Sequence, residues 1–146
     1  MSNLSPPLPL SLPAGPVWVQ LFGASRVQAG FPSPAEDHQV ERIDLLRELV
    51  RHPQATFMLR VRGDSMRDAG IFDGTVVLVD KAVRPKHGHV VIAVVDGEFT
   101  CKRLGMRGGR MALHAANPAF ADWHPSEGQT LEVWGVVVAC IHQFAV

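Results

Sequence analysis

The sequence predicts a mainly β protein, in which an extended N-terminal arm precedes one domain of antiparallel strands with one or two short helices. Apolar and polar residues alternate with a period of two in several runs after residue 55, as in half-buried strands. Asp96-Gly97 lies between two such runs and is a strong signal for a tight hairpin. Seven of the 11 prolines lie in the first 34 residues, where they exclude a continuous helix.

Length and composition limit the classes of protein to which this chain can belong. A chain of 146 residues suits one domain, and 47% hydrophobic with 19% charged residues is typical of a folded, soluble protein. The formal net charge of zero argues against a protein that holds nucleic acid mainly by neutralising phosphates. No apolar run is long enough to cross a membrane, and residues 1–25 lack the basic start of a secretory signal. These features favour a soluble cytoplasmic protein.

Residues 1–29 form the predicted arm. The first charged side chain is Arg26, and the many prolines favour an extended chain that is partly polyproline II. Val17, Val19 and Leu21 are too apolar for a purely solvated linker, so we expect the arm to lie on its own domain or on a partner. A frayed tail with a few apolar residues is the alternative.

The domain is predicted to span residues 30–146 and to begin with a segment of two possible structures. Ser33-Pro34-Ala35-Glu36 could start a helix, with Ser33 as N-cap and Glu36 completing a capping box. Residues 44–50 give a stronger helix signal, because four apolar residues form a stripe that Pro53 ends. Either one long helix or a strand followed by a short helix fits residues 34–52.

Six strands are predicted after this segment, and none of them repeats another in sequence. Gly135 lies inside the last one, where it predicts a bulge or bend. The predicted strands are Thr56–Val61, Thr75–Val79, His89–Val95, Glu98–Leu104, Arg110–His114 and Leu131–Phe144.

Ser65 is a candidate nucleophile. It stands in Gly63-Asp64-Ser65-Met66, directly after a predicted strand, and a short helical turn is expected from Met66 to Ala69. Gly63 permits a tight turn, which presents the hydroxyl beside backbone N–H groups that could form an oxyanion hole. A serine between a glycine and a helix is more often an N-cap, so this pattern alone does not establish a nucleophile.

Lys102 is a candidate general base. It lies in the middle of a predicted strand beside Arg103, and one of these two cations must face the more buried side. A desolvated lysine loses affinity for its proton, and the neutral amine can then accept one from a serine hydroxyl. The alternative is a lysine whose stem lies along the sheet while its amine reaches solvent.

The histidines and cysteines give weaker signals. His87 and His89 would share one strand face, but no third ligand follows at a recognisable spacing, so no metal or other cofactor is predicted. A Ser-His-Asp triad stays possible, although Ser65 is not in a Gly-x-Ser-x-Gly motif. Cys101 and Cys140 lie in apolar runs, and we expect both to be buried free thiols.

These residues together resemble the LexA/UmuD family of self-cleaving proteins from about Phe22 to the C-terminus. Ala29-Gly30-Phe31-Pro32-Ser33-Pro34-Ala35 resembles the family's cleavage segment, and Val133-Trp134-Gly135-Val136-Val137 resembles its last strand. The segments that carry the remaining resemblance are Gly63-Asp64-Ser65-Met66, Asp68-Ala69-Gly70-Ile71, Asp73-Gly74, and Val95-Asp96-Gly97-Glu98-Phe99-Thr100 followed by Lys102.

The resemblance implies a curled antiparallel β domain, like that of LexA and the signal peptidases, and a Ser-Lys dyad. Ser65 would be the nucleophile and Lys102 the general base, and they would attack the protein's own Ala29–Gly30 bond. The backbone N–H groups of Asp64 and Ser65 are our hypothesis for the oxyanion hole. Because alanine and glycine are small, a tight cleft could admit this bond at close approach.

The resemblance also implies partners. Only 29 residues precede Gly30, too few and too rich in proline for the DNA-binding domain of the LexA repressors, so we expect no direct specific DNA binding. The chain therefore resembles the UmuD branch, the accessory subunits of the error-prone translesion polymerase V. That branch implies a homodimer, stimulation by the RecA filament on single-stranded DNA, and a polymerase subunit of the UmuC type. The cleaved product, residues 30–146, would be the active form in the SOS response.

Two other functions stay open. The chain could be an interaction module in which the Ser-Lys pair is idle and the arm binds partners. It could also be a processing enzyme of the signal-peptidase type, although the expected absence of a membrane anchor argues against this function.

Overall fold

The computed structural model describes residues 8–9, 15–22 and 40–146. These residues belong to two compact units, the larger with residues 8–9 and 52–146 and the smaller with residues 15–22 and 40–51. The predicted cleavage bond, Ala29–Gly30, and the possible helix start at Ser33–Glu36 lie outside the described residues.

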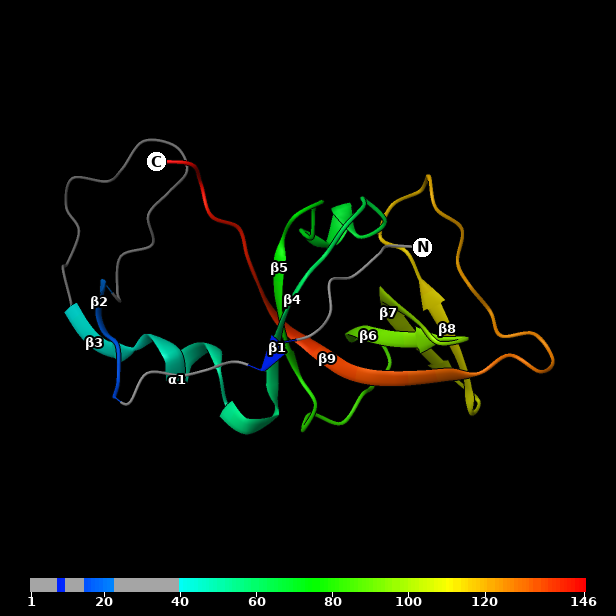
Figure 1. Ribbon diagram of the computed structural model, residues 1–146, viewed down its shortest axis with the longest axis horizontal. Coiled ribbons are helices and arrows are strands. Elements are labelled where there is room, and N and C mark those ends of the chain that lie inside the picture. The colour runs from blue at the N-terminus through cyan, green and yellow to red at the C-terminus, as the bar shows by residue number, and fades with distance from the viewer. Residues whose placement is uncertain (1–7, 10–14, 23–39) are drawn as a thin grey trace. The chain divides into compact units, whose positions relative to one another are not determined.

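The larger unit holds a seven-stranded sheet in which every pair of neighbouring strands is antiparallel (Figure 1). Their order in the sheet is β1-β4-β5-β9-β6-β7-β8. The strands are β1 (Leu8–Pro9), β4 (Thr56–Arg60), β5 (Val76–Asp80), β6 (Val90–Val95), β7 (Glu98–Arg107), β8 (Arg110–His114) and β9 (Leu131–Ile141).

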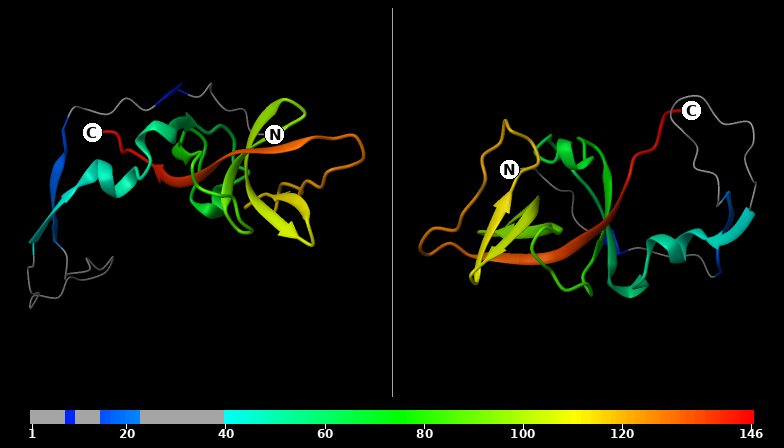
Figure 2. Two further views of the ribbon diagram at one scale, coloured as in Figure 1. Left: turned by 90° about the horizontal axis from the view of Figure 1, so that it is seen from below. Right: turned by 180° about the vertical axis from the view of Figure 1, so that it is seen from behind.

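The prediction of a mainly β fold with a curled antiparallel sheet is therefore confirmed. In Figure 2 the β6-β7-β8 end of the sheet turns away from the β4-β5 end, and β9 runs along both. The six predicted strands are all present, although β9 ends at Ile141 rather than at Phe144. Two short 3-10 helices, Pro53–Ala55 and Arg67–Ala69, complete the unit, and the second replaces the helical turn expected from Met66 to Ala69.

The β6-β7 hairpin turns at Asp96-Gly97, as predicted. Asp96 has φ +49° and Gly97 has φ +83°, so both central residues are left-handed. This is the type I′ geometry that matches the twist of the two flanking strands, and glycine adopts it without steric cost. The hairpin aligns β7 with β6 so that Lys102 lies opposite Val91.

Two clusters of buried side chains form the core of the larger unit. One includes Leu59, Val61 and Met66, and so reaches the turn that carries Ser65; the other includes Val91, Leu104 and Val136. Strand β9 is bulged twice, where its register shifts against β5 and against β6. Gly135 lies at the second bulge, as the sequence indicated.

We expect Gly135→Ala to destabilise the domain, because an added Cβ would lie 2.5 Å from Cγ1 of the fully buried Val79. Overpacking of this kind costs about 1–3 kcal/mol of unfolding free energy, which urea denaturation would measure. Gly15→Ala is the matched control, since nothing lies within 4 Å of its added methyl. An unchanged urea midpoint in the Gly135 variant would show that the core accommodates the methyl group.

The smaller unit contains a two-stranded antiparallel sheet of β2 (Trp18–Phe22) and β3 (Val40–Asp44), followed by helix α1 (Leu45–Leu49). Asp44 is the N-cap, and its carboxylate accepts a hydrogen bond from Leu46 N at 3.2 Å. A strand followed by a short helix is therefore the correct alternative for the described part of residues 34–52. The arm residues 18–22 are paired with β3 and are not a frayed tail in this segment.

No helix in the described part of the chain has the length and apolar character to cross a membrane.

Candidate active site

Ser65 lies in a tight turn between β4 and the 3-10 helix Arg67–Ala69. Gly63 opens the turn with φ +88°, and its N–H donates to Asp73 Oδ1 at 2.8 Å. The Ser65 side chain is buried, with 3% of the residue exposed. The N-cap of the 3-10 helix is Met66, so the sequence-based alternative of Ser65 as N-cap is not what the structure shows.

Lys102 extends from β7 to the Ser65 turn. Its Nζ donates to Ser65 Oγ at 2.9 Å, although the two residues are 37 positions apart in the sequence. The sequence predicted that one of two neighbouring cations would be buried. Lys102 is 7% exposed, whereas Arg103 is exposed and donates to the carbonyl of Gly88. The structure thus brings together the two side chains selected as nucleophile and base.

The surroundings of Lys102 favour its neutral form. Burial lowers the pKa of Lys102 below its ordinary value of 10.5, because the ammonium loses hydration. A nearby carboxylate would oppose this shift, but no ion pair among the described residues includes Lys102. Nζ also donates to Thr100 Oγ1 at 3.1 Å and to the Cys101 carbonyl at 3.2 Å.

The protonated amine of Lys102 has three N–H groups, one for each of its acceptors on Ser65, Thr100 and Cys101. When Lys102 loses one proton, two N–H groups stay available for Thr100 and Cys101, and a lone pair can face Ser65. The direction of the hydrogen bond then reverses, and the Ser65 hydroxyl donates to Nζ. The arrangement can therefore remove the proton of the serine hydroxyl. Sequence reasoning did not identify Thr100, whose only signal was its place two residues before Lys102 on the same strand face.

The backbone carbonyls of the Ser65 turn are anchored by a loop that follows β8. Asp64 O accepts from Asn117 Nδ2 at 2.8 Å and from Arg67 N at 3.2 Å, and Ser65 O accepts from Ala116 N at 2.8 Å. Asp64 and Ser65 were the predicted sources of oxyanion-hole N–H groups. Asn117 was not predicted from the sequence, in which the turn signal Asn-Pro at 117–118 was the available hint.

Cys101 is unsuited to be a nucleophile. It is fully buried, and burial raises the pKa of its thiol to about 12, which keeps the sulfur protonated at neutral pH. The prediction for Cys140 was wrong in part: it is a free thiol, but it is exposed. Cys140 is the penultimate residue of β9, where its Sγ lies 3.8 Å from the Gly70 carbonyl instead of inside the core.

His87 and His89 interact with backbone N–H groups. His87 Nδ1 accepts from Met106 N at 2.9 Å, and His89 Nδ1 accepts from Lys86 N at 3.2 Å. Both lie before the start of β6 at Val90, so they do not form the pair on one strand face that the sequence suggested. Within residues 8–9, 15–22 and 40–146, no cluster of three or more histidine, cysteine or acidic side chains could hold a metal ion.

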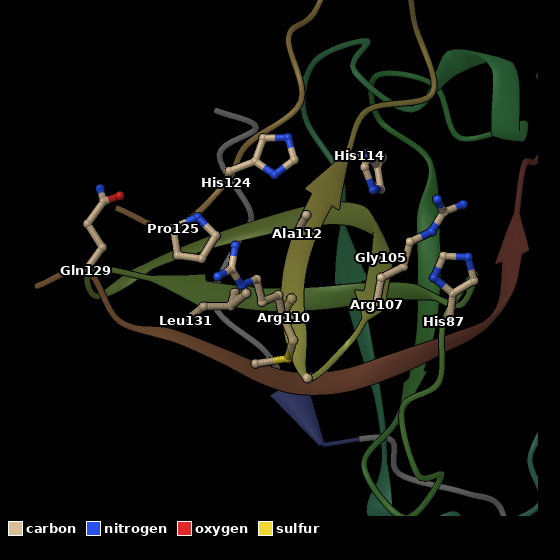
Figure 3. A pocket seen from close by; sticks show the side chains of 12 residues that line it. His87, Gly105, Arg107, Arg110, Ala112, His114, His124, Pro125, Gln129 and Leu131 are labelled. Carbon is tan, nitrogen blue, oxygen red and sulfur yellow. The ribbon is translucent and has the colours of Figure 1, made fainter. Parts of the chain in front are cut away.

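A separate hollow of about 910 Å³ lies on the β7-β8 hairpin (Figure 3). Arg107, Arg110 and Leu131 line it together with His114, whose Nδ1 lies 2.8 Å from Asp122 Oδ2. That hydrogen bond lowers the pKa of Asp122. Gly105, a lining residue, faces away from the side of β7 that carries Lys102, because neighbouring strand residues alternate between faces. The hollow is therefore distinct from the Ser65–Lys102 pair.

Known proteins share sequence similarity with most of this chain. Residues 20–138 match the family model described as Peptidase S24-like. The chain is 48% identical over 118 residues to Protein SamA of Salmonella typhimurium, a match that covers 81% of each chain. It is 42% identical over 117 residues to Protein MucA of Escherichia coli, which covers 80% of each. It is also 41% identical over 117 residues to the LexA repressor of Vibrio atlanticus, but that match covers only 56% of the repressor.

Proposed function

The chain belongs to the peptidase S24-like family, whose members are self-cleaving serine peptidases, and we propose that its catalytic groups are Ser65 and Lys102. The observation that carries this proposal is the 2.9 Å contact between Lys102 Nζ and Ser65 Oγ, both of them on buried side chains. A nucleophile and a base at hydrogen-bond distance, with the pKa of the base lowered by burial, are what a serine needs to attack a peptide bond near neutral pH.

We propose that the substrate is the protein's own Ala29–Gly30 bond. Lys102 Nζ takes the proton of the Ser65 hydroxyl while Oγ bonds to the carbonyl carbon of Ala29. The carbonyl oxygen becomes an oxyanion, and its collapse breaks the bond to the nitrogen of Gly30, which takes the proton from Lys102. Water, activated by the neutral amine, then hydrolyses the ester between Ala29 and Ser65 and regenerates both side chains.

The backbone N–H groups of Asp64 and Ser65 are the proposed donors to the oxyanion. The left-handed Gly63, whose N–H donates to Asp73, directly precedes the first of these peptides, and the anchored carbonyl of Asp64 holds the second. Fixed donors stabilise charge that develops in the transition state without having to reorganise, and removing one costs about 10²–10³-fold in rate.

The proposed biological role is that of an autoproteolytic regulator in the SOS response. Similarity to SamA and MucA over about four fifths of each chain, and to LexA over little more than half of the repressor, supports a member of the LexA/UmuD family. We propose that residues 30–146 are the active accessory subunit of an error-prone translesion polymerase, acting as a homodimer in the cytoplasm with a partner of the UmuC type.

We further propose that a RecA filament on single-stranded DNA stimulates cleavage without contributing a catalytic residue. Docking of the arm would desolvate Lys102 further and so favour its neutral form. The filament then needs only to bind the docked state more tightly than the undocked state, since a ligand shifts an equilibrium by its differential affinity.

The pH dependence of self-cleavage tests the role of Lys102 in the unmodified protein. Below the pKa of Lys102, the neutral fraction rises about tenfold per pH unit, and above it the fraction is constant. We therefore expect the rate to rise from pH 7 and to level off before pH 10.5, because burial lowers this pKa from its ordinary value. Intact-mass measurements on the purified full chain would follow the reaction and locate the broken bond.

The outcome separates three cases. A cut between Ala29 and Gly30 with a rate that rises and then levels off supports the proposal. If the chain is stable alone, the incubation is repeated with RecA, single-stranded DNA and nucleotide, and the same pH profile is expected. A rate that falls with pH, or a cut at a different bond, contradicts the assigned base or the assigned substrate.

A further inference from the structure

Asn117 connects the loop after β8 with the peptide bond that precedes the proposed nucleophile. Its side chain is buried, with 7% of the residue exposed, and its Nδ2 donates to Asp64 O at 2.8 Å across 53 positions of sequence. Its Oδ1 accepts from Ala119 N at 3.0 Å. Both ends of the amide are thus engaged, and the orientation of its plane is determined by two backbone groups.

The same loop contacts the Ser65 turn at two further points. Ala116 N donates to Ser65 O at 2.8 Å, and Asp68 N donates to Ala116 O at 2.7 Å. Together with the Asn117 bond, these interactions span the turn on both sides of Ser65. The loop itself is held in shape by Phe120 N, which donates to Asn117 O at 3.0 Å. The position of the Ser65 turn is therefore determined by hydrogen bonds to the loop after β8 as well as by bonds within the turn itself.

Because a peptide bond is planar, the hydrogen bond from Asn117 to Asp64 O also affects the orientation of the Ser65 N–H. Asp64 C=O and Ser65 N–H belong to one peptide unit and point in opposite directions in a trans peptide, and no described peptide bond is cis. An atom that holds the Asp64 oxygen therefore sets the direction of the Ser65 N–H. That N–H is one of the two donors that the proposed function assigns to the oxyanion.

We infer that Asn117 is a positioning residue for self-cleavage, which holds the Asp64–Ser65 peptide so that the Ser65 N–H is directed at the oxyanion. This inference rests on the proposed function. The Asp64 oxygen also accepts a longer hydrogen bond from Arg67 N, at 3.2 Å. Arg67 belongs to the same turn, so this bond does not fix the turn relative to the rest of the domain. Asn117 anchors the peptide from the loop after β8 and so determines its place in the site.

Asn117→Leu tests the inference, because leucine has nearly the shape of asparagine, carries no donor and introduces no charge beside Lys102. We expect the plateau rate of self-cleavage at alkaline pH to fall about 10–100-fold, as for a small misplacement of a catalytic group. The pH at which the rate is half maximal should not change, since the three partners of Lys102 stay in place. A loss of the base would instead remove the pH dependence.

Gly135→Ala is the control for stability, because its added methyl meets Val79, in the core cluster that also contains Met66, and leaves the hydrogen bonds of Asp64 and Ser65 in place. Rates are compared at a temperature where circular dichroism shows both variants folded, and the Gly135 variant should cleave at the wild-type rate. If the leucine variant does not fold, Asn117→Ala replaces it, since alanine is smaller, carries no charge and likewise removes the donor to Asp64 O.

The results distinguish failure of this inference from failure of the proposed function. A folded Asn117 variant with a plateau within threefold of the wild type overturns the positioning role while cleavage by Ser65 stands. The positioning role is also overturned if the plateau rate is unchanged but the pH of half-maximal rate shifts, because Asn117 would then act through Lys102. If the wild type itself does not cleave in a Ser65-dependent way, the proposed function fails and this inference with it.

Discussion

Replacing Ser65 with alanine is expected to leave the protein at its full length of 146 residues under every condition in which the wild type is cut. The change removes the oxygen that Lys102 Nζ contacts at 2.9 Å and that the proposed mechanism uses for attack. Loss of a serine nucleophile lowers the rate of related chemistry by at least about 10³-fold. Intact mass after incubation at alkaline pH, and again with the RecA filament, measures the effect.

The alanine variant should fold normally. Ser65 loses one buried hydroxyl, and Lys102 keeps Thr100 Oγ1 and the Cys101 carbonyl as acceptors. Ser126→Ala is the matched control, because Ser126 is an exposed serine whose hydroxyl bonds only within its own turn, to Gln129 at 2.6 Å. A Ser65 variant that is cut at Ala29–Gly30 as fast as the control would show that another nucleophile acts or that a contaminating protease does.

The same variant separates an autoprotease from an interaction module. If the Ser-Lys pair is idle, Ser65→Ala retains all partner binding and all biological function. If cleavage activates the protein, the variant lacks the activity, and a chain that starts at Gly30 restores it even when it carries Ser65→Ala.

Much of the fold could be predicted because strands and hairpins leave local signals. Alternation of apolar and polar residues predicted strands β4 to β9. Asp96-Gly97 predicted the turn between β6 and β7, since few residue pairs adopt a left-handed backbone at two successive positions. The order of strands in the sheet is not local. Nothing in the sequence of β9 indicates that it separates β5 from β6.

The site was predictable in part for the same reason. Ser65 and Lys102 could be selected individually, one by its turn and the other by an unexpected cation in a strand. The contact of Asn117 with Asp64 joins segments 53 positions apart, and it depends on where the fold places the loop after β8. Cys140 shows the converse error, because its apolar neighbours suggested burial but it lies at the end of a strand, where the core no longer covers it.

Lys102→Met is expected to abolish self-cleavage and its dependence on pH. Methionine has a similar length and an apolar side chain, so it fills the space of the buried lysine stem but accepts no proton from Ser65. General bases contribute about 10²–10⁴-fold to rate, and we expect a loss in this range when intact mass is followed over time. The variant should be folded, because it removes a desolvated amine from a site in which no described ion pair compensates it.

Two companion variants decide whether the basicity of Lys102 or only its charge is needed. Lys102→Arg keeps a cation but should be as inactive as the methionine variant from pH 7 to 10, because a guanidinium does not lose its proton in this range. Arg103→Met removes the neighbouring cation, which is exposed and bonds to the Gly88 carbonyl, and it should cleave at the wild-type rate. Activity in the arginine variant would mean that a positive charge beside Ser65 suffices, and the assignment of Lys102 as general base would then be wrong. Inactivity of both Lys102 variants with an active Arg103 variant supports proton transfer at Lys102 Nζ, since only the cation on the buried face of β7 is then required.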